Sequence, residues 1–345
     1  MSKRTNAKMK VIKVLLGIFI TLLIIILAAG STAIFFVNNK IGKMNKVNID
    51  EETLGLSDNN NLTGYRNVAI FGIDSRSSNY QLGNRSDCIM IASINNKTHD
   101  IKLVSVYRDT YMQIEGHGLD KVTHAYSYGG PELAIKTLNE NLDLNIKEFV
   151  TVNFDAVAEA VDALGGIKME ITSAEVKYIN GYIDETSSVT DKKSKHITKP
   201  GIYVLDGVQA VAYSRIRYTS GGDYKRTERM RDVITAMIAK LKTKSVSQIN
   251  TIADRVLPQV YTNLSMTDLL SMIPAVASFN VGESIGWPYE TRGATISGVW
   301  YGAPVTLESN VCKLHQEVFG DSDYEVPASI KTISDKIINK TGYTK

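Results

Sequence analysis

The sequence contains few of the residues that build covalent or metal-held scaffolds. Two cysteines among 345 residues, Cys88 and Cys312, are too few for a disulfide framework, so we expect free thiols and an inert, buried Cys88. His124 has no second histidine at the spacing of zinc ligands, which argues against zinc and favours a structural hydrogen bond. The net charge is only +3, so functional positive charge must be local, and no basic nucleic-acid-binding module is visible.

Charged residues are absent from one long stretch, residues 14–37, which at helical rise can cross a bilayer of about 30 Å. Several basic residues precede this stretch, and it is too long for a signal-peptide core. We therefore expect a transmembrane signal anchor at 14–37, a cytoplasmic basic tail at 1–13 and the rest of the chain outside the cell. A removed secretory signal is the alternative, and it would change the anchoring but not the compartment.

Polar residues 38–64 predict an extracytoplasmic stalk, after which one large domain is the simplest interpretation of the length. We expect a catalytic domain at 65–241 and a C-terminal extension at 242–345 packed on the same domain.

Charged residues stand beside the ends of three predicted strands, at 67–73, 88–95 and 101–106. An open α/β sheet places its ligands at the carboxyl ends of its strands. These residues are Asp74, Arg76, Arg85, Asp87, Arg108 and Asp109.

Asp74 and Asp87 are the paired carboxylates in this set. Two carboxylates repel each other unless a cation lies between them, and oxygen ligands beside substrate phosphates suit magnesium. The alternative is that each forms a salt bridge with a nearby arginine, Arg76 or Arg108.

Residues 212–231 hold six basic side chains. If the chain is extended by Tyr213, Arg215 and Arg217 point to one side, because side chains alternate along a strand. A helix that begins near Gly207 is equally open, and it would remove that argument.

A glycine turn at 221–222 follows, and Asp223 stands where a helix cap is expected. Arg226 and Arg229 then share a face at helical spacing, close to backbone amides that favour anions. Four convergent guanidinium groups predict a pyrophosphate ligand, and an ordinary solvated basic face is the alternative.

The other predicted elements are helices at 131–142, 155–164, 246–259, 267–278 and 305–318, a helix ending near 241, strands at 149–153 and 167–171, and a hairpin at 287–301. Residues 121–130 are expected to form a loop and residues 184–199 a mobile loop. Apolar residues in these helices indicate a core, although a lipid-lined groove would give the same pattern.

Seven ordered segments resemble the motifs of the LytR-CpsA-Psr family. They are IFGIDSR at 70–76, NRSD at 84–87, SVYRDT at 105–110, HAYSYGG at 124–130, VNFD at 152–155, VDALGG at 161–166 and the arginine stretch at 212–231. The resemblance covers about residues 65–231 and fades after Leu241.

This resemblance implies an α/β fold in which a central mixed sheet, flanked by helices, encloses a hydrophobic lipid groove. It implies a phosphotransferase in a Gram-positive-type envelope that moves wall teichoic acid or capsular polysaccharide from undecaprenyl-pyrophosphate onto peptidoglycan. Asp74 and Asp87 match the Mg²⁺ ligands. The pyrophosphate-binding positions are Arg108, Arg215, Arg217 and Arg226, with Arg76, Arg85 and Arg229 inside the same motifs.

The sequence departs from the family pattern at Asn84, Cys88, Tyr107, Lys225 and Met230. Met230 replaces a glutamine that typically assists phosphate binding, so the departures concern how the substrate is bound. The arginines all remain. A polyprenyl-phosphate sensor without catalysis is the alternative function, and turnover of a lipid-linked glycan distinguishes the two.

Overall fold

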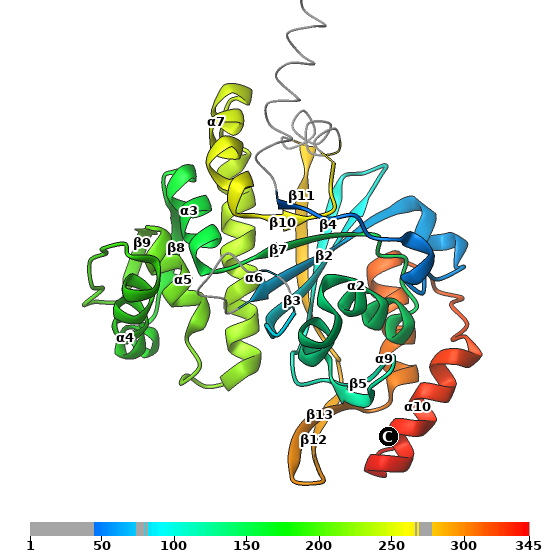
Figure 1. Cartoon of the computed structure of the whole chain (residues 1–345). Helices are drawn as coiled ribbons and strands as arrows, with labels where there is room; N and C mark the ends of the chain where they lie inside the picture. The colour runs from blue at the N-terminus through cyan, green and yellow to red at the C-terminus, as the bar shows by residue number, and fades with distance from the viewer. Residues whose placement is uncertain (1–44, 74–79, 81, 266–267, 269–277, 345) are drawn as a thin grey trace, which may run out of the picture.

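The computed structural model describes residues 45–73, 80, 82–265, 268 and 278–344. Its centre is a seven-stranded sheet with the order β1-β10-β7-β2-β3-β4-β11 (Figure 1). The strands are β1 (Asn45–Lys46), β2 (Tyr65–Ile73), β3 (Ser86–Asn95), β4 (Asp100–Val106), β7 (Glu148–Val152), β10 (Tyr261–Thr262) and β11 (Asn280–Trp287). Because β2, β3 and β4 pair antiparallel while β7 and β11 join in parallel, the predicted mixed α/β sheet is confirmed.

Helices cover both faces of this sheet (Figure 1). One face carries α2 (Val122–Leu142), α9 (Leu307–Leu314) and α10 (Ala328–Thr341), and the other carries α3 (Phe154–Leu164), α6 (Gly222–Leu241) and α7 (Val246–Val256). Side chains alternate between these faces along β2: Phe71 packs on Tyr126 of α2 at 5.3 Å between ring centroids, while Ile70 and Gly72 turn to the other face. Burial on both faces explains why the strand sequences are continuously apolar.

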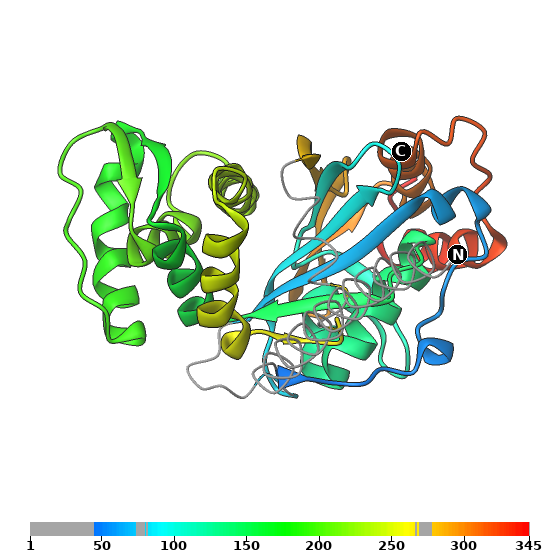
Figure 2. The ribbon, with the colours of Figure 1, turned by 90° about the horizontal axis from the view of Figure 1, so that it is seen from above.

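A smaller lobe lies beside the sheet (Figure 2). It consists of α4 (Ser173–Thr190), α5 (Gly207–Arg215), β8 (Ile167–Ile171) and β9 (Gly201–Leu205), and it has its own apolar cluster. Two hairpins complete the architecture, β5 (Tyr111–Ile114) with β6 (Gly118–Lys121), and β12 (Thr291–Ile296) with β13 (Val299–Pro304).

Two predicted elements are wrong in the N-terminal two thirds, and one open alternative is decided in favour of a helix. Residues 121–130 are not a loop, because α2 begins at Val122 and continues across a break at Gly129 and Gly130. Gly130 has φ 66° and ψ −157°, a conformation that glycine adopts readily, and Pro131 then starts the second half of the helix. The expected mobile loop at 184–199 is also shorter, since α4 runs to Thr190. The extended alternative for 208–216 fails because α5 is helical through Arg215.

The C-terminal third adds strands and a helix that the sequence patterns did not indicate. β11 joins the central sheet beside β4, and α10 packs its Ile330, Ile333 and Ile337 into the main core. The helix expected at 267–278 falls almost wholly outside the described residues. Within residues 45–64, Leu54 and Leu62 are fully buried against the domain.

Among the helices within residues 45–344 that the structure describes, none combines the length and apolar character needed to cross a bilayer. The anchor expected at 14–37 lies outside the described residues.

Candidate functional site

A cavity of about 690 Å³ lies between the sheet and the helices α3, α6 and α7. Ile70, Met90 and Val150 line it from the sheet, and Met237 of α6 and Ile252 of α7 line it from the helices. The apolar residues that the sequence assigned to core therefore also build a groove, which suits a hydrocarbon chain.

Charged residues line the same cavity: Asp87, Arg215, Arg217 and Arg226. They come from β3, the end of α5, the turn after it and the first turns of α6. One cavity thus joins an apolar groove to a cluster of guanidinium groups, an arrangement that fits an amphipathic molecule with an anionic head.

Asp87 and Arg108 form the centre of this cluster, called the arginine cluster below together with Arg217, Asp223 and Arg226. Arg108 Nη1 lies 2.8 Å from Asp87 Oδ1, and Arg217 Nη2 lies 4.0 Å from Asp87 Oδ2. Arg108 Nε also lies 3.4 Å from Asp109, whose other oxygen is 2.8 Å from Lys121 Nζ. Asp87 is thus paired with Arg108 and Arg217, and Asp109 is a second acidic partner of Arg108.

Asp223 is a member that the sequence analysis placed as a helix cap instead. The cap of α6 is Gly221, with φ 91°, so Asp223 falls inside the first turn. Its carboxylate lies 3.0 Å from Arg226, 3.7 Å from Arg217 and 3.9 Å from Arg108. Burial raises the pKa of Asp223, while Arg108 and Arg217 oppose that rise. Its spacing of three from Arg226 is the sequence signal that could have indicated this pairing, which the sequence analysis missed.

Arg215 lines the cavity in a different way from Arg217. Its Nη2 lies 2.9 Å from Glu185, its Nη1 donates to Thr186 Oγ1 at 3.0 Å, and its guanidinium carbon lies 4.8 Å from the centroid of Phe154. The two arginines reach one cavity because the helix ends between them, and not through strand alternation.

Arg229 does not join the arginine cluster. It is 1% exposed, its Nε lies 2.9 Å from Glu175, and its terminal nitrogens donate to Ile216 O at 3.0 Å and Thr219 Oγ1 at 2.8 Å. These contacts give Arg229 a structural role, and the expectation that it shares a binding face with Arg226 is not met.

The remaining predicted site residues are only partly described. Arg85 is exposed in the turn before β3, and Asp74 and Arg76 lie outside the described residues. Within the described part of the chain, no group of three or more metal-binding side chains occurs. Asp87 lines the groove with both carboxylate oxygens facing arginines, and a carboxylate is a donor of the type that magnesium takes.

Two of the family departures line the groove itself, Cys88 and Met230. Burial raises the pKa of the Cys88 thiol to about 12, and Asp87 adds to that rise, so the thiol stays protonated and unreactive. Tyr107, a third departure, packs edge-on against Tyr224 at 4.5 Å between centroids.

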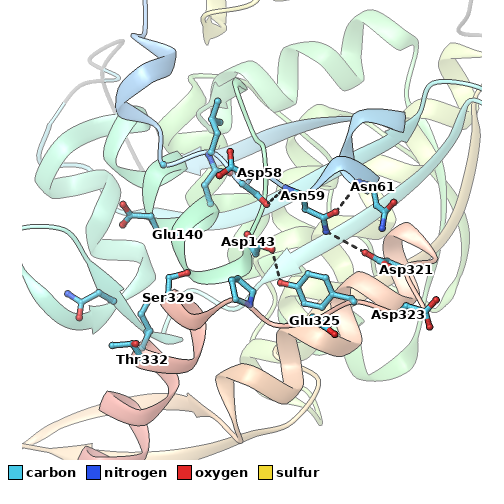
Figure 3. Close-up of a pocket in the computed structure, with 18 of the residues that line it drawn as sticks. Asp58, Asn59, Asn61, Glu140, Asp143, Asp321, Asp323, Glu325, Ser329 and Thr332 are labelled. Atoms are coloured by element: carbon cyan, nitrogen blue, oxygen red, sulfur yellow. Dashed lines mark hydrogen bonds between the residues drawn. The ribbon is translucent and has the colours of Figure 1, made fainter.

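A larger cavity, of about 950 Å³, lies on the other side of the sheet, between α2 and α10 (Figure 3). Carboxylates surround it: Asp58, Glu140, Asp143, Asp321, Asp323 and Glu325. Tyr324 donates to Asp143 at 2.8 Å, and Asn59 donates to Asp321 at 3.4 Å (Figure 3). This negative charge repels phosphate, so the smaller cavity with the arginines is the candidate site.

The chain matches the LytR_cpsA_psr family over residues 30–313. The match continues well past Leu241, where the sequence motifs fade.

Among similar proteins is the Polyisoprenyl-teichoic acid--peptidoglycan teichoic acid transferase TagT of Bacillus subtilis (strain 168). It is 35% identical over 232 residues, which are 66% of this chain and 69% of the relative. The transferase TagU of Oceanobacillus iheyensis, of the same descriptive name, is 28% identical over 320 residues, which are 88% of this chain and 92% of the relative.

A solved structure described as the LytR-CPS2A-psr family protein YwtF (TagT) with bound octaprenyl pyrophosphate lipid is similar in fold. It has a TM-score of 0.55 and 29% identity, over 76% of this chain and 93% of that chain.

Proposed function

This chain belongs to the LytR-CpsA-Psr family, and on that basis we propose that it is a phosphotransferase that moves an anionic glycopolymer from a polyprenyl-pyrophosphate carrier to peptidoglycan. The proposed polymer is a wall teichoic acid or a capsular polysaccharide, and the proposed carrier lipid is undecaprenyl. The names of the relatives TagT and TagU support a teichoic acid.

One observation carries this proposal: the apolar groove and the arginine residues line one continuous cavity. A polyprenyl chain requires an apolar groove, and a pyrophosphate requires several bidentate cationic partners beside it. The bound octaprenyl pyrophosphate in the similar solved structure is a ligand of this type.

The proposed reaction is displacement at the sugar-proximal phosphorus. A muramic acid hydroxyl oxygen forms a bond to that phosphorus as the bond to the bridging oxygen breaks, and undecaprenyl phosphate leaves with the bridging oxygen. Positioning and charge neutralisation supply most of the rate in phosphoryl transfer, so Arg108, Arg217 and Arg226 would hold the pyrophosphate oxygens and stabilise the developing charge.

The hydroxyl proton needs a base, and Asp74 is the proposed acceptor. Asp109 follows Arg108 in the chain, and its contacts with Arg108 and Lys121 support a positioning role for it. Asp74 and Asp87 would also hold magnesium, which supplies positive charge to phosphate oxygens when bound.

The proposed location is the outer face of the cell membrane, with a single anchor at 14–37 and the N-terminus in the cytoplasm. The uncharged apolar run and the basic residues before it support this topology. The proposed acceptor, peptidoglycan, lies in the same compartment.

Purified full-length protein with a lipid-linked glycan, magnesium and peptidoglycan tests the function. Arg217→Ala is expected to lower the transfer rate by about 10²–10³, because it removes one donor from the charge-stabilising set. Arg255→Ala is the matched control, since Arg255 is half exposed on α7, forms an ion pair with Glu159 of α3 at 2.6 Å and does not line the groove. An unchanged rate in Arg217→Ala contradicts the assignment.

The same assay separates the transferase from a sensor. Release of undecaprenyl phosphate with stoichiometric polymer transfer supports the enzyme. Tight lipid binding without any release identifies a non-catalytic polyprenyl-phosphate sensor.

A further inference from the structure

The β12–β13 hairpin carries a large apolar side chain on its solvent face. Trp300 is 48% exposed, although Trp287, the other tryptophan of the chain, is fully buried. Ala294 and Ala303 on the opposite face of the hairpin are buried, as strand alternation requires. An indole on the solvent face has no role in the core, and a single exposed ring is not unusual, but neighbouring exposed aromatic side chains such as Trp300 and Tyr224 form surface of the kind that marks a binding site.

Two glycines without side chains allow this indole ring to pack flat on the backbone of the hairpin. A Cβ atom on Gly293 would lie 2.7 Å from Trp300 Nε1, so the ring lies directly over the backbone of the neighbouring strand. A Cβ atom on Gly302 would lie 3.8 Å from Trp300 Cη2 and 3.4 Å from Thr291 Oγ1. Gly293 and Gly302 are paired across the ribbon on the same face as Thr291 and Trp300. We call Thr291, Gly293, Trp300, Gly302 and the adjoining Tyr224 the aromatic shelf.

The aromatic shelf adjoins the arginine cluster. Gly302 N donates to Asp109 O at 2.9 Å, and Asp109 contacts Arg108. Tyr224, 44% exposed, follows Asp223 in the chain; burial raises the pKa of its phenol, and the nearby Thr291 side chain opposes that rise. The hydrogen bond from Gly302 to Asp109 and the position of Tyr224 beside Asp223 therefore connect the shelf to the residues proposed to hold the pyrophosphate.

The shelf and the lipid groove lie on different sides of the arginine cluster. The groove continues from the cluster between the sheet, α3 and α7, and no shelf residue lines it. In Figure 1 the hairpin projects at the bottom of the view, whereas β10, which pairs with the first described strand β1, lies in the upper half. A donor lipid would thus fill one side of the arginine cluster and leave the shelf side for the second substrate.

From this geometry we propose that the aromatic shelf binds a sugar ring of the acceptor glycan strand and holds it beside the phosphate to be transferred. The proposal rests on the proposed function. Pyranose rings present a face of C–H bonds that packs on indole and phenol rings, and their hydroxyls suit donors and acceptors such as the Thr291 and Tyr224 hydroxyls.

Binding is tested without catalysis. Because Trp287 is buried, a change in tryptophan fluorescence of the full-length protein on titration with N-acetylglucosamine oligomers should come from Trp300. Saturable change in the wild type and its loss in Trp300→Phe are expected. An emission that does not respond to the oligomers overturns the proposal, even if the protein transfers polymer.

Kinetics give the second test. Trp300→Ala is expected to raise the KM for the acceptor about five- to tenfold. The rate of donor hydrolysis, in which water replaces the acceptor and undecaprenyl phosphate is released, should stay unchanged. Trp300→Tyr should restore most of the loss, since it keeps a flat ring. Gly293→Ala should reproduce the loss without removing the indole, because the added methyl group displaces the ring.

Val299→Ala is the matched control, since Val299 is 43% exposed on the same hairpin but on its other face. An acceptor KM in Trp300→Ala equal to that of the wild type overturns the proposal, whereas a wild type without any transfer refutes the proposed function instead. A shift of Trp300 emission on phosphatidylglycerol vesicles alone would assign the shelf to a membrane surface. Dimerisation lost in Trp300→Ala would assign it to a second copy of the chain.

Discussion

Arg226 and Arg229 are three residues apart on α6 and have different surroundings. Arg226 pairs with Asp223 at the cavity, whereas Arg229 is enclosed by Glu175 and the carbonyl of Ile216. A buried charge that loses its partner is costly, because the remaining charge stays out of water. The two positions should therefore separate binding from stability.

Arg229→Met is expected to lower the free energy of unfolding by about 3–5 kcal/mol, because it leaves the buried Glu175 carboxylate without its opposite charge, with only the hydrogen bonds from Thr172. Urea denaturation followed by circular dichroism measures this change. Arg226→Met is the matched control: its partner Asp223 keeps two other arginines, so stability should fall less while transfer is lost. The double variant Arg229→Met/Glu175→Met should recover much of the stability, and a loss equal to that of Arg229→Met alone would contradict a role confined to this pair.

His315 gives a pH dependence of stability. It is fully buried, Nε2 lies 2.9 Å from Leu142 O, and burial lowers its pKa below the ordinary value of about 6.5. Below a pH of about 6.5 the histidine of the unfolded chain takes up a proton that His315 of the folded chain does not, so the free energy of unfolding falls as pH decreases, by at most about 1.4 kcal/mol per pH unit. Above a pH of about 6.5 the contribution of His315 to the free energy of unfolding is constant.

The variant His315→Gln removes this titration and keeps a side-chain amide toward Leu142 O. Thermal unfolding between pH 7 and pH 5 should show a smaller loss of melting temperature in the variant than in the wild type. Parallel curves for the two proteins would rule out His315 as the source.

For single residues, the sequence predicted which residues belong to the site better than it predicted which residues they contact. Strand ends singled out Asp87 and Arg108, spacing singled out Arg217 and Arg226, and the family resemblance joined them in one expected site; the structure brings these four together. Spacing did not indicate Glu175 as a partner of Arg229, because that contact spans 54 positions and depends on how the small lobe packs.

Among the helices and strands, local sequence patterns correctly predicted the strands that are buried on both faces of the sheet. The strands β2, β3, β4 and β7 were predicted because both sheet faces are covered and their residues are apolar throughout. The first half of α2 was missed because its sequence, with Gly129 and Gly130, has the composition of a loop. The hydrogen bond from Tyr126 to Tyr80 O joins residues far apart in the chain, so no local pattern could indicate it. α10 was missed because its polar residues mask three isoleucines on one face.

The helices α3 and α7 form the walls of the groove, so a bulky residue on α7 should restrict the lipid chain. Ala253→Trp is expected to raise the Kd for long polyprenyl pyrophosphates about tenfold or more, with little effect on a short farnesyl pyrophosphate. Isothermal titration calorimetry with the two ligands measures the difference. Ala174→Trp, on the exposed first turn of α4, is the matched control, and equal weakening of both lipids would show that Ala253→Trp disturbs the head-group site instead.

In the whole molecule, the order of strands in the sheet differs from their order in the chain. β10 and β11 come from residues beyond Leu241, yet β10 pairs with β7 and β11 pairs with β4. The sequence patterns placed these residues in an extension, because no local signal reports which strand a distant segment will join. The family match to residue 313 agrees with the pairing.

This arrangement predicts that residues 65–241 do not fold alone. Without β11, the edge of β4 becomes unpaired, and Trp287, which is fully buried and donates to Asn310 O at 3.2 Å, is lost from the core. The face of the sheet under α2 also loses Val311 and Ile337, so its apolar surface is opened to water.

We expect the isolated 65–241 chain to bind the dye ANS, to lack a near-ultraviolet circular dichroism signal and to unfold without a cooperative transition. A chain of residues 45–345 is the control and should show cooperative unfolding, because it retains every described strand. Cooperative unfolding of the 65–241 chain would mean that the arginine cluster and the groove walls other than α7 form an independent unit. In that case the β12–β13 hairpin, which carries the other four residues of the aromatic shelf, is not needed for the arginine cluster to fold.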